Sequence, residues 1–398
     1  MEATISRIVC QAKEFMSPRD VDGWLLYDYR GMNPIFWETI GYIPNVTRPC
    51  WLWIPAKGDP KLLVSQVDQN RFVHLGIDTI YWSSRHQMVK ELGILTKKSQ
   101  SIAMEYSTMG MLPRASKIDA GTLELVRDLG VDVVSSADLV QFTTQRWDDL
   151  QLESHIKAAE ILNQTVKSAF DYIGCEISSS QGEGPTEFEI AEFVRARFER
   201  ENLYAPDGPV VAANAHAADP HFEPTADNSS KIKAGDWILI DLWGRLNGDR
   251  TVCSDITWTA YVGSSVPHRY QEVFDVVVGG RDAAVNMMEK SHSAGRELQG
   301  WELDSIARKY ITERGYGDFF SHRLGHSLGR EVHGNAVNLD GWETSDTRHL
   351  IPRIAVTIEP GIYIPGEFGV RSEIDVFYHD SGPMVTTERQ MNPYLIEI

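Results

Sequence analysis

The feature that most constrains this fold is a set of acidic residues placed in or beside apolar, strand-forming runs in the last third of the chain. Asp241 ends the apolar run of residues 237–240. Glu359 follows the apolar run of residues 354–358, and Asp255 lies among further strand-forming residues. An ionised side chain in such a place needs a strong partner, because removing a charge from water is costly. We therefore expect these strands to meet at a cation-binding site.

Two further residues, Glu373 and His326, complete a set of oxygen and nitrogen donors. Glu373 lies in a strand-like run at residues 370–378, where the alternation of a strand puts it on the same face as Arg371 and Asp375. Taken singly, such residues are usually rim charges or members of ion pairs. Four carboxylates and one imidazole together suit Mn, Co, Fe or Zn and can hold a pair of ions. The predicted ligands are Asp241, Asp255, His326, Glu359 and Glu373.

The first two aspartates allow a geometric prediction. The Asn247-Gly248 pair between them is a strong signal for a hairpin turn. A two-residue turn centred on this pair would set Asp241 opposite Ser254 and would point Asp241 and Asp255 to opposite faces. We therefore expect either an odd-length loop centred on Gly248 or a bulge in one strand.

The histidines of residues 321–333 need separate interpretations. His322 and His326 have the spacing of a zinc-binding helix, but Arg323 stands where that motif requires Glu, and Gly325 argues against a rigid helix. We therefore interpret His326 as a single ligand on an extended or looped segment. A neutral imidazole at His333 would be able to donate or shuttle a proton near a metal-bound oxyanion, and the alternative for it is a hydrogen-bonded core histidine.

In order and in local sequence, these motifs resemble those of the pita-bread metallopeptidases, a family that includes prolidase, aminopeptidase P and methionine aminopeptidase. The resemblance covers roughly residues 150–398 and rests on the segments 239–241, 254–257, 325–333, 358–361 and 370–373. It implies that Asp241 chelates one metal ion and that Asp255 and Glu373 bridge two. His326 and Glu359 would complete the second ion.

The same resemblance implies catalytic roles for further residues. It implies that Glu359 also handles the proton of the nucleophilic water and that His221 contacts the scissile amide. His333 would assist the tetrahedral intermediate, and Arg371 would lock the bridging Glu or meet a substrate carboxylate. The implied reaction is hydrolysis of the Xaa-Pro bond of dipeptides or peptide N-termini by a metal-bridging hydroxide. Manganese is the expected metal, with cobalt, zinc or iron as alternatives.

Two departures from the family pattern bear on the substrate. The chain reads Asp241-Leu-Trp-Gly244, with a longer gap to the second aspartate, where the family usually has Asp-x-Gly or Asp-x-Ala. It also has Ile374 after Glu373, where Asp or Asn is common. Neither departure removes a ligand. Two alternatives stay open: a hydrolase or lyase of the same fold acting on a small non-peptide substrate, and a non-catalytic peptide-binding relative.

The length of the chain predicts two domains. At 398 residues it exceeds what one hydrophobic core usually supports, and 42% hydrophobic residues are enough for two. We expect an α+β protein with an N-terminal α/β creatinase-like domain at residues 1–150 and a pita-bread catalytic domain at 151–398, in which helices flank a curved antiparallel sheet. By the resemblance, the first domain covers the active site and builds a homodimer. Helices are expected at residues 150–173, from Thr186 onward, and at 269–289 and 301–314.

Charge and composition exclude several classes of partner. A formal net charge of −18 without a basic stripe disfavours nucleic acid and anionic lipid. No run is long and apolar enough for a membrane span, and the first residues lack the pattern of a signal peptide. The 4 scattered cysteines fit reduced thiols. We therefore expect a cytoplasmic enzyme whose partners are a peptide or dipeptide substrate and a second copy of itself.

Overall fold

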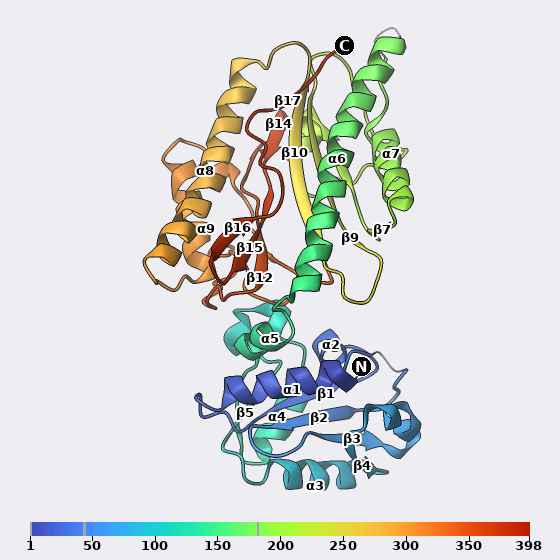
Figure 1. Cartoon of the computed structure of the whole chain (residues 1–398), viewed down its shortest axis with the longest axis vertical. Helices are drawn as coiled ribbons and strands as arrows, with labels where there is room; N and C mark the ends of the chain where they lie inside the picture. The colour runs from blue at the N-terminus through green and yellow to red at the C-terminus, as the bar shows by residue number, and fades with distance from the viewer. Residues whose placement is uncertain (1, 43–44, 181–182) are drawn as a thin grey trace. The chain divides into compact units, whose positions relative to one another are not determined.

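The computed structural model describes residues 2–42, 45–180 and 183–398 (Figure 1). The chain divides into two compact units, Met1–Arg146 and Trp147–Ile398. The division falls a few residues before the domain boundary expected at residue 150. Each unit has hydrophobic clusters of its own, and the units are described separately below.

The first unit is a mixed sheet with helices on both faces. Its strands follow the order β4-β3-β2-β1-β5-β6. Neighbours β1, β2 and β3 pair antiparallel, whereas β3–β4, β1–β5 and β5–β6 pair parallel. The strands are β1 Gly23–Asp28, β2 Cys50–Pro55, β3 Lys61–Ser65, β4 Asp78–Trp82, β5 Ser101–Met104 and β6 Asp132–Ser135. The helices are α1 Glu2–Met16, α2 Pro34–Ile40, α3 Arg85–Thr96, α4 Ala120–Asp128 and α5 Ala137–Thr143, with 3₁₀ turns η1 Gln66–Arg71, η2 Val73–Leu75, η3 Thr108–Gly110 and η4 Pro113–Ala115.

Strand alternation explains why this sheet is covered twice. Trp24 and Leu26 of β1 pack in a cluster with α1, α2 and α5, whereas Leu25 between them packs with α3 and α4. Because successive side chains of a strand point to opposite faces, an apolar run such as 24–26 needs partners on both sides. The expected α/β architecture of the N-terminal domain is confirmed.

The second unit contains long helices and antiparallel sheets. Its helices are α6 Asp149–Ser179, α7 Glu187–Arg200, α8 His268–Ser293 and α9 Gly300–Thr312, with 3₁₀ turns η5 Asn214–Ala218 and η6 Gly317–Phe319. The strands before α8 are β7 Leu203–Tyr204, β8 Val210–Ala213, β9 Trp237–Leu246 and β10 Ser254–Val262. Those after α9 are β11 Ser327–Leu328, β12 Ile354–Ile358, β13 Gly361–Ile364, β14 Phe368–Arg371, β15 Ile374–His379, β16 Gly382–Val385 and β17 Tyr394–Ile396. All four helices occur where the sequence predicted them.

Local chemistry accounts for the beginning of α7. Thr186 accepts a hydrogen bond from the backbone of Glu189, and the Glu189 side chain accepts from the backbone N–H of Thr186 at 2.7 Å. This reciprocal capping box satisfies backbone groups that the first turn of a helix leaves unpaired. The capping box predicted from the sequence is confirmed.

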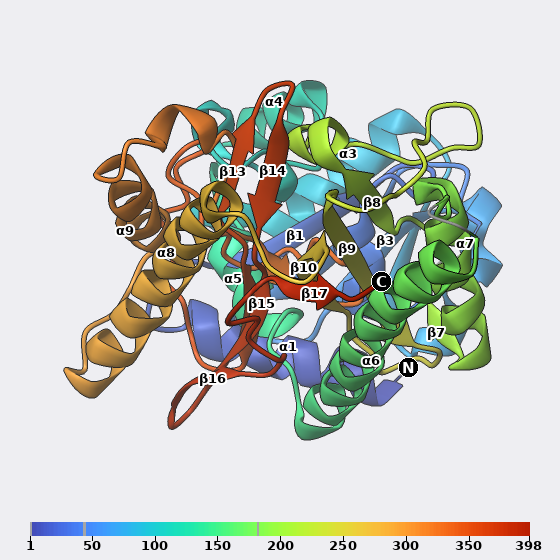
Figure 2. The ribbon, with the colours of Figure 1, turned by 90° about the horizontal axis from the view of Figure 1, so that it is seen from above.

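The helices of the second unit cover two groups of strands. One sheet has the order β17-β10-β9-β7, with β8 paired to β9, and packs against α6 and α7. A second sheet, β11-β12-β15-β16, and the β13–β14 hairpin pack against α8 and α9. Viewed from above, α6 and α7 lie on one side of these strands and α8 and α9 on the other (Figure 2). The strands between the helix pairs carry the predicted ligands.

The β9–β10 hairpin resolves the question of the two aspartates. Asp241 is paired with Thr257 and Trp243 with Asp255, so both aspartates point to the same face. The odd-length connection expected from the sequence is confirmed. Its centre is wrong, however: the register is symmetric about Asp249 rather than Gly248, because the paired ladder ends at Gly244 and Ser254.

The run 370–378 is not one strand, contrary to the sequence prediction. β14 ends at Arg371 and β15 begins at Ile374, so Glu373 lies in the break between them. β14 pairs with β13, whereas β15 pairs with β12. The backbone N–H of Glu373 donates to Thr257 O of β10 at 3.2 Å. The change of partner strand therefore delivers Glu373 to the strand that carries Asp255.

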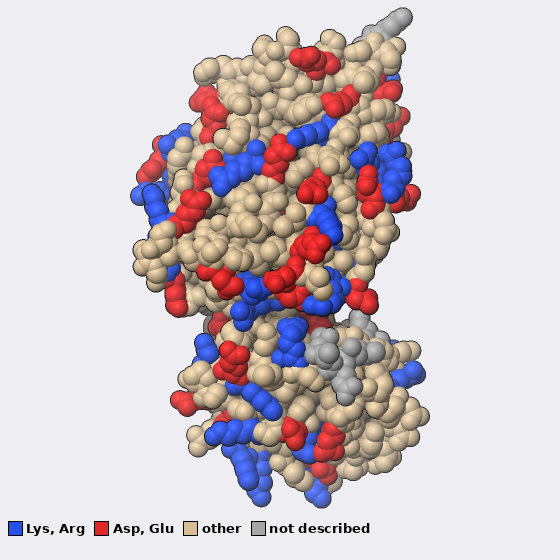
Figure 3. All heavy atoms as spheres, in the orientation of Figure 1, with Lys and Arg blue, Asp and Glu red and all other residues tan. Residues whose placement is uncertain are grey.

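The surface shows charges of both signs. On the face drawn in Figure 3, Lys and Arg side chains alternate with Asp and Glu, and no continuous basic stripe is visible among the described residues. Among the described helices, none is both long and apolar enough to span a membrane.

Candidate metal centre

Three residues from distant parts of the second unit form the middle of the candidate centre. Asp255 lies on β10, His326 directly precedes β11, and Glu373 lies between β14 and β15. One ligand atom from each lies within 4.8 Å of the others, and all three side chains are buried. His326 is on a non-helical segment, as the sequence predicted. Three donors of this kind at this separation can hold a metal ion.

The other two predicted ligands lie beside this group. The His326 Nε2 atom is 3.5 Å from Glu359 Oε1 and 3.6 Å from Asp255 Oδ2. The Asp241 side chain forms an ion pair with Arg371, and its charge helps to raise the pKa of Asp255. The structure thus brings all five predicted donors together from β9, β10, the segment before β11, the end of β12 and the β14–β15 break.

The electrostatics of the cluster show a shortage of positive charge. Burial, followed by the charges of Glu373 and Asp241, raises the pKa of Asp255 well above its ordinary value. Burial and the charges of Glu359 and Asp241 do the same to the pKa of Glu373, and burial raises the pKa of Glu359 to about 7. Like charges in a dry site disfavour the ionised form. Cations would relieve this repulsion.

Unsatisfied oxygen atoms support the same conclusion. Among the described residues, the buried Oδ1 atoms of Asp241 and Asp255 have no hydrogen-bond partner. Buried polar atoms are nearly always paired, so an unpaired carboxylate oxygen needs an explanation such as an ion. The donor set and its unpaired atoms therefore fit divalent metal ions.

Thr257 holds two members of the centre, and the sequence reasoning missed it. Its Oγ1 donates to Glu373 Oε2 at 2.7 Å and accepts from Arg371 Nε at 2.9 Å. Thr257 is fully buried, two residues after Asp255 on the same strand face. That spacing was a usable signal, because side chains two apart on a strand point the same way.

A second chain of contacts reaches the centre through Arg371. Its Nη1 donates to Tyr363 OH at 3.1 Å, and His322 Nε2 lies 2.8 Å from the same hydroxyl. Burial and the charge of Arg371 lower the pKa of His322 to about 3, so its imidazole is neutral. Sequence reasoning considered His322 only for its spacing from His326 and missed Tyr363.

Asp375 supports the centre from behind. Its Oδ2 accepts from the backbone N–H of Asp255 at 3.0 Å and from Ser254 Oγ at 2.7 Å. The buried imidazole of His155 on α6 lies 3.7 Å from the same oxygen. Asp375 therefore fixes the backbone of a predicted bridging ligand.

The two predicted catalytic histidines differ in how they are placed. The ring of His333 is exposed and lies 4.3 Å from the ring of His326, edge to face. The core alternative for His333 is therefore wrong. His221 is also exposed, and its backbone N–H donates to Asp219 Oδ1 at 3.0 Å. Among the described contacts, none links the His221 ring to the five donors.

The loop that carries His221 has a buried support. The adjacent Phe222 stacks on His216, with ring centroids 4.2 Å apart. His216 Nδ1 lies 2.9 Å from the carboxylate of Glu187, which is fully buried at the start of α7. The position of the loop is thus tied to the helix, whichever way the exposed His221 ring turns.

This arrangement has the parts of a metal-assisted hydrolytic site. It combines a buried group of carboxylates and an imidazole with an adjacent exposed imidazole. It also includes Glu359, a carboxylate beside His326 that can exchange a proton with water. The buried Arg371 limits the excess of negative charge by pairing with Asp241.

Comparisons with known proteins agree with this chemistry. The sequence model of metallopeptidase family M24 matches residues 153–380. An Xaa-Pro dipeptidase of Pyrococcus furiosus is 33% identical over 378 residues, which are 92% of each chain. An uncharacterized peptidase of Staphylococcus saprophyticus is 29% identical over 260 residues, 65% of this chain and 67% of that one.

The solved structure of dipeptidase PepE from Mycobacterium ulcerans shares the fold of this chain. It matches 100% of this chain and 99% of its own with a TM-score of 0.77 at 19% sequence identity. Together with the mixed helices and antiparallel sheets of the second unit, this likeness confirms the predicted α+β pita-bread architecture. The family match covers more than half of the sequence, and the Pyrococcus relative extends it over nearly all of the rest. The chain therefore belongs to metallopeptidase family M24.

Proposed function

We propose that this protein is an Xaa-Pro peptidase that uses two divalent metal ions, with manganese as the native metal. The observation that carries the proposal is the convergence of five donors in one buried cluster whose Asp241 and Asp255 oxygens lack partners. The ligands would be Asp241 for one ion, Asp255 and Glu373 as bridges, and His326 and Glu359 for the second ion. These donors are hard and mixed in type, which suits Mn and also permits Co, Zn or Fe.

Bound divalent ions would supply Lewis acidity toward the scissile carbonyl and would lower the pKa of an attacking water. The residues of the chain would do the rest. Glu359, which lies 3.5 Å from His326 Nε2, accepts the proton of the water. His333, exposed beside His326, donates to the developing oxyanion, and His221 contacts the scissile amide. The charge of Arg371 opposes the burial that raises the pKa of Asp241, and their ion pair holds Asp241 in place.

The preference for proline is supported by the Pyrococcus relative, which is named an Xaa-Pro dipeptidase and aligns over 92% of this chain. The amide nitrogen before a proline ring carries no hydrogen, so a site cannot recognise it as a donor. Selectivity would then come from the shape of the site around the ring. The N-terminal unit is proposed to cover the active site and to form a homodimer.

The test is a steady-state assay of the full chain loaded with each metal in turn. Substrates would be Xaa-Pro dipeptides, longer Xaa-Pro peptides and matched peptides with alanine in place of proline. We expect turnover of proline substrates, loss of turnover on chelation, and recovery with manganese. Metal analysis should give two ions per chain, and sedimentation should give a dimer.

A matched pair of variants separates the chemistry from the fold. Glu359→Gln should abolish turnover, whereas Glu367→Gln, in the β13–β14 turn, should leave it unchanged. Metal-loaded protein that hydrolyses no proline peptide would contradict the proposal. It would favour the alternatives of a small non-peptide substrate or a non-catalytic peptide-binding protein.

A further inference from the structure

The first unit contains a cavity between two segments of the chain. Its volume is about 240 Å³, and its walls come from residues 27–33, at the end of β1 and just after it, and from residues 117–119, between β5 and α4. This volume is smaller than the ~300–1,000 Å³ of pockets that bind drug-sized ligands. The cavity therefore suits a molecule about as large as a single amino acid.

The cavity lies at a place where α/β sheets commonly bind ligands. β1 and β5 are parallel neighbours. The chain after β1 leads to α2, on one face of the sheet, whereas the chain after β5 leads to α4, on the other face. Such a divergence leaves a crevice outside the carboxyl ends of the two strands, and open α/β sheets bind ligands there.

One buried residue joins the two walls of the cavity. The Glu105 carboxylate accepts from Asn33 Nδ2 at 2.9 Å, and the Glu105 carbonyl accepts from the backbone N–H of Lys117 at 2.9 Å. Asn33 Nδ2 also donates to the carbonyl of Tyr27 at 2.8 Å. The walls are therefore fixed before a ligand arrives, which lowers the entropic cost of binding.

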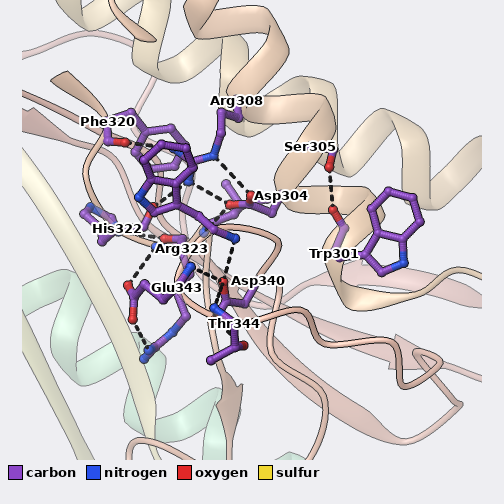
Figure 4. A network of polar contacts seen from close by, with 12 residues as sticks. Trp301, Asp304, Ser305, Arg308, Phe320, His322, Arg323, Asp340, Glu343 and Thr344 are labelled. Carbon is purple, nitrogen blue, oxygen red and sulfur yellow. Dashed lines mark hydrogen bonds and ion pairs between the residues drawn. The ribbon is translucent and has the colours of Figure 1, made fainter. Parts of the chain in front are cut away.

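Lys117 is the cation of the cavity, and its ammonium group is unpaired. Other partly buried cations have acidic partners: Arg308 pairs with Asp304, and Arg323 pairs with Glu343 (Figure 4). Among the described residues, none hydrogen-bonds to the Lys117 ammonium or forms an ion pair with it. Lys117 is half-buried, and burial lowers its pKa. An ammonium that has lost part of its water and has no partner gains by binding an anion.

Two aspartates line the same cavity and differ in what they can still bind. Asp28 is 1% exposed, and its carboxylate accepts from the backbone N–H groups of Gly31 and Asn33. Asp119 is exposed, and its carboxylate accepts from the N–H and the hydroxyl of Thr122 at 2.9 and 2.6 Å. A carboxylate can accept about four hydrogen bonds, so Asp119 keeps acceptor sites for a ligand cation.

The rest of the wall is aromatic and apolar. Tyr29 and Met32 are 40% and 71% exposed. Tyr27 beside them is held by Trp51, with the two ring centroids 4.5 Å apart. Large apolar side chains left open at a cavity favour a ligand with an apolar body. The cavity therefore combines a cation, an anion and an apolar wall.

We propose that this cavity binds a free apolar α-amino acid. The carboxylate of the ligand pairs with Lys117, its ammonium group pairs with Asp119, and its side chain contacts Tyr29 and Met32. A zwitterion matches both charges of the cavity, whereas a simple acid or a simple amine matches one charge and is repelled by the other. The site does not depend on the metal centre, although free amino acids are also the products of the proposed peptidase.

Calorimetry of the metal-free full chain tests the proposal with four probes. L-Leucine should bind at one site. L-Leucinamide lacks the carboxylate, N-acetyl-L-leucine lacks the ammonium group, and glycine lacks the apolar side chain, so each should bind about tenfold more weakly or worse. No detectable binding of L-leucine, or equal affinity for all four probes, would overturn the proposal. Either result would leave the proposed peptidase function intact, because the assay involves no metal and no turnover.

Two substitutions assign the two charges separately. Lys117→Gln should remove the preference for L-leucine over L-leucinamide and keep the preference over N-acetyl-L-leucine. Asp119→Asn should do the reverse, and α4 should begin as before because asparagine caps helices as well as aspartate does. Lys97→Gln, at an exposed lysine after α3, should bind all four probes as the wild type does. Wild-type preferences in both cavity variants would contradict the assignment.

Hydrogen exchange of the wild-type protein locates the ligand without any substitution. L-Leucine should slow the exchange of amides in residues 29–33 and 117–122, because these amides open less often when the ligand holds both walls. Exchange in the β13–β14 hairpin of the second unit should not change. If L-leucine slowed exchange only in the second unit, the ligand would lie at the metal centre and the cavity would not be its site.

Discussion

Asp241 and Thr257 lie directly opposite each other in the β9–β10 pair, and this register builds one wall of the candidate centre. Because side chains alternate along a strand, Asp255 shares the face of Thr257 and therefore of Asp241. Thr257 also bonds to both Glu373 and Arg371. A single strand pairing thus positions two ligands directly and a third through a hydroxyl group.

Replacing Thr257 with Val should weaken metal binding without changing the shape of the strand. The variant leaves Glu373 Oε2 and Arg371 Nε without the hydroxyl that joins them. We expect a loss of about 1–3 kcal/mol of folding stability and about 10- to 100-fold in metal affinity. Thermal unfolding and metal titration by calorimetry measure the two effects.

Thr259→Val is the matched control for this change. Thr259 lies two residues further along β10, is fully buried, and its Oγ1 has no partner among the described residues. Removing an unpaired hydroxyl should leave stability equal or slightly higher and metal affinity unchanged. Equal losses of metal affinity in both variants would show that Thr257 fills space and does not orient Glu373.

Asp255→Asn should stabilise the metal-free protein while abolishing its response to metal. The metal-free cluster suffers from burial and mutual repulsion, which raise the pKa of Asp255 well above its ordinary value. Metal at a hundredfold excess over its Kd should stabilise the wild type by about 2.7 kcal/mol. The variant should melt higher than wild type in EDTA and shift little on adding manganese.

An exposed aspartate provides the control for this charge change. Asp249→Asn, at the tip of the β9–β10 connection, should melt like the wild type both in EDTA and with manganese. Should Asp255→Asn melt lower than wild type in EDTA, the repulsion deduced for the cluster would be wrong.

Part of this structure follows from local sequence. The capping box at Thr186 and the apolar run of β1 depend on neighbours in the chain, and both occur as predicted. The odd length of the β9–β10 connection was also predictable, because Asp241 and Asp255 can share one face of the strands only if the loop is odd or a strand is bulged. Its centre was missed because the Asn247-Gly248 pair is not the midpoint of the ladder.

Contacts between distant segments were beyond the reach of local pattern. The break at Glu373 arises because β14 and β15 choose different partner strands, and period-two alternation through 370–378 gives no sign of it. The bond from Thr257 to Glu373 and the pair of Arg323 with Glu343 each join residues whose neighbours in sequence do not predict the contact. The five donors were identifiable by residue type and order, but their supporting residues were not.

Glu105→Gln should remove a pH dependence from the stability of the first unit. Glu105 is fully buried, and burial raises its pKa from 4.5 to about 7 although Trp24, Asn33 and Ser136 all donate to it. The folded protein therefore keeps a proton that the unfolded chain loses between these values. This contribution is complete below pH 4.5 and is lost as pH rises through 7, about 3 kcal/mol in all.

Hydrogen exchange of the β1 and β5 amides tests this assignment. It would be measured on the full chain in urea at pH 5, 6 and 7 and would report the stability of the first unit. In the wild type the stability of the first unit should fall as pH rises. In Glu105→Gln this stability should change less with pH over the same range. Glu124→Gln, an exposed residue on α4, should retain the wild-type slope. If the stability of Glu105→Gln depended on pH as strongly as that of the wild type, the proton would belong to another group.

Gly325→Ala should disrupt the centre by steric means alone. A Cβ at this position would lie 2.1 Å from Thr357 O, a backbone atom of β12 that cannot rotate away. The adjacent His326 exchanges bonds with Thr357, donating to its Oγ1 at 3.0 Å and accepting from its N–H at 2.8 Å. Separating the two segments would withdraw His326 from Asp255, so we expect about 1–3 kcal/mol of destabilisation and loss of metal binding.

Gly93→Ala is the control for this change. The new methyl group lies within α3 and meets Leu129 Cδ2 at 3.5 Å, so this variant should instead stabilise the protein by about 1 kcal/mol. Full metal binding by Gly325→Ala would mean that the segment before β11 can move without losing its ligand, and the close approach to β12 would then have no role in the site.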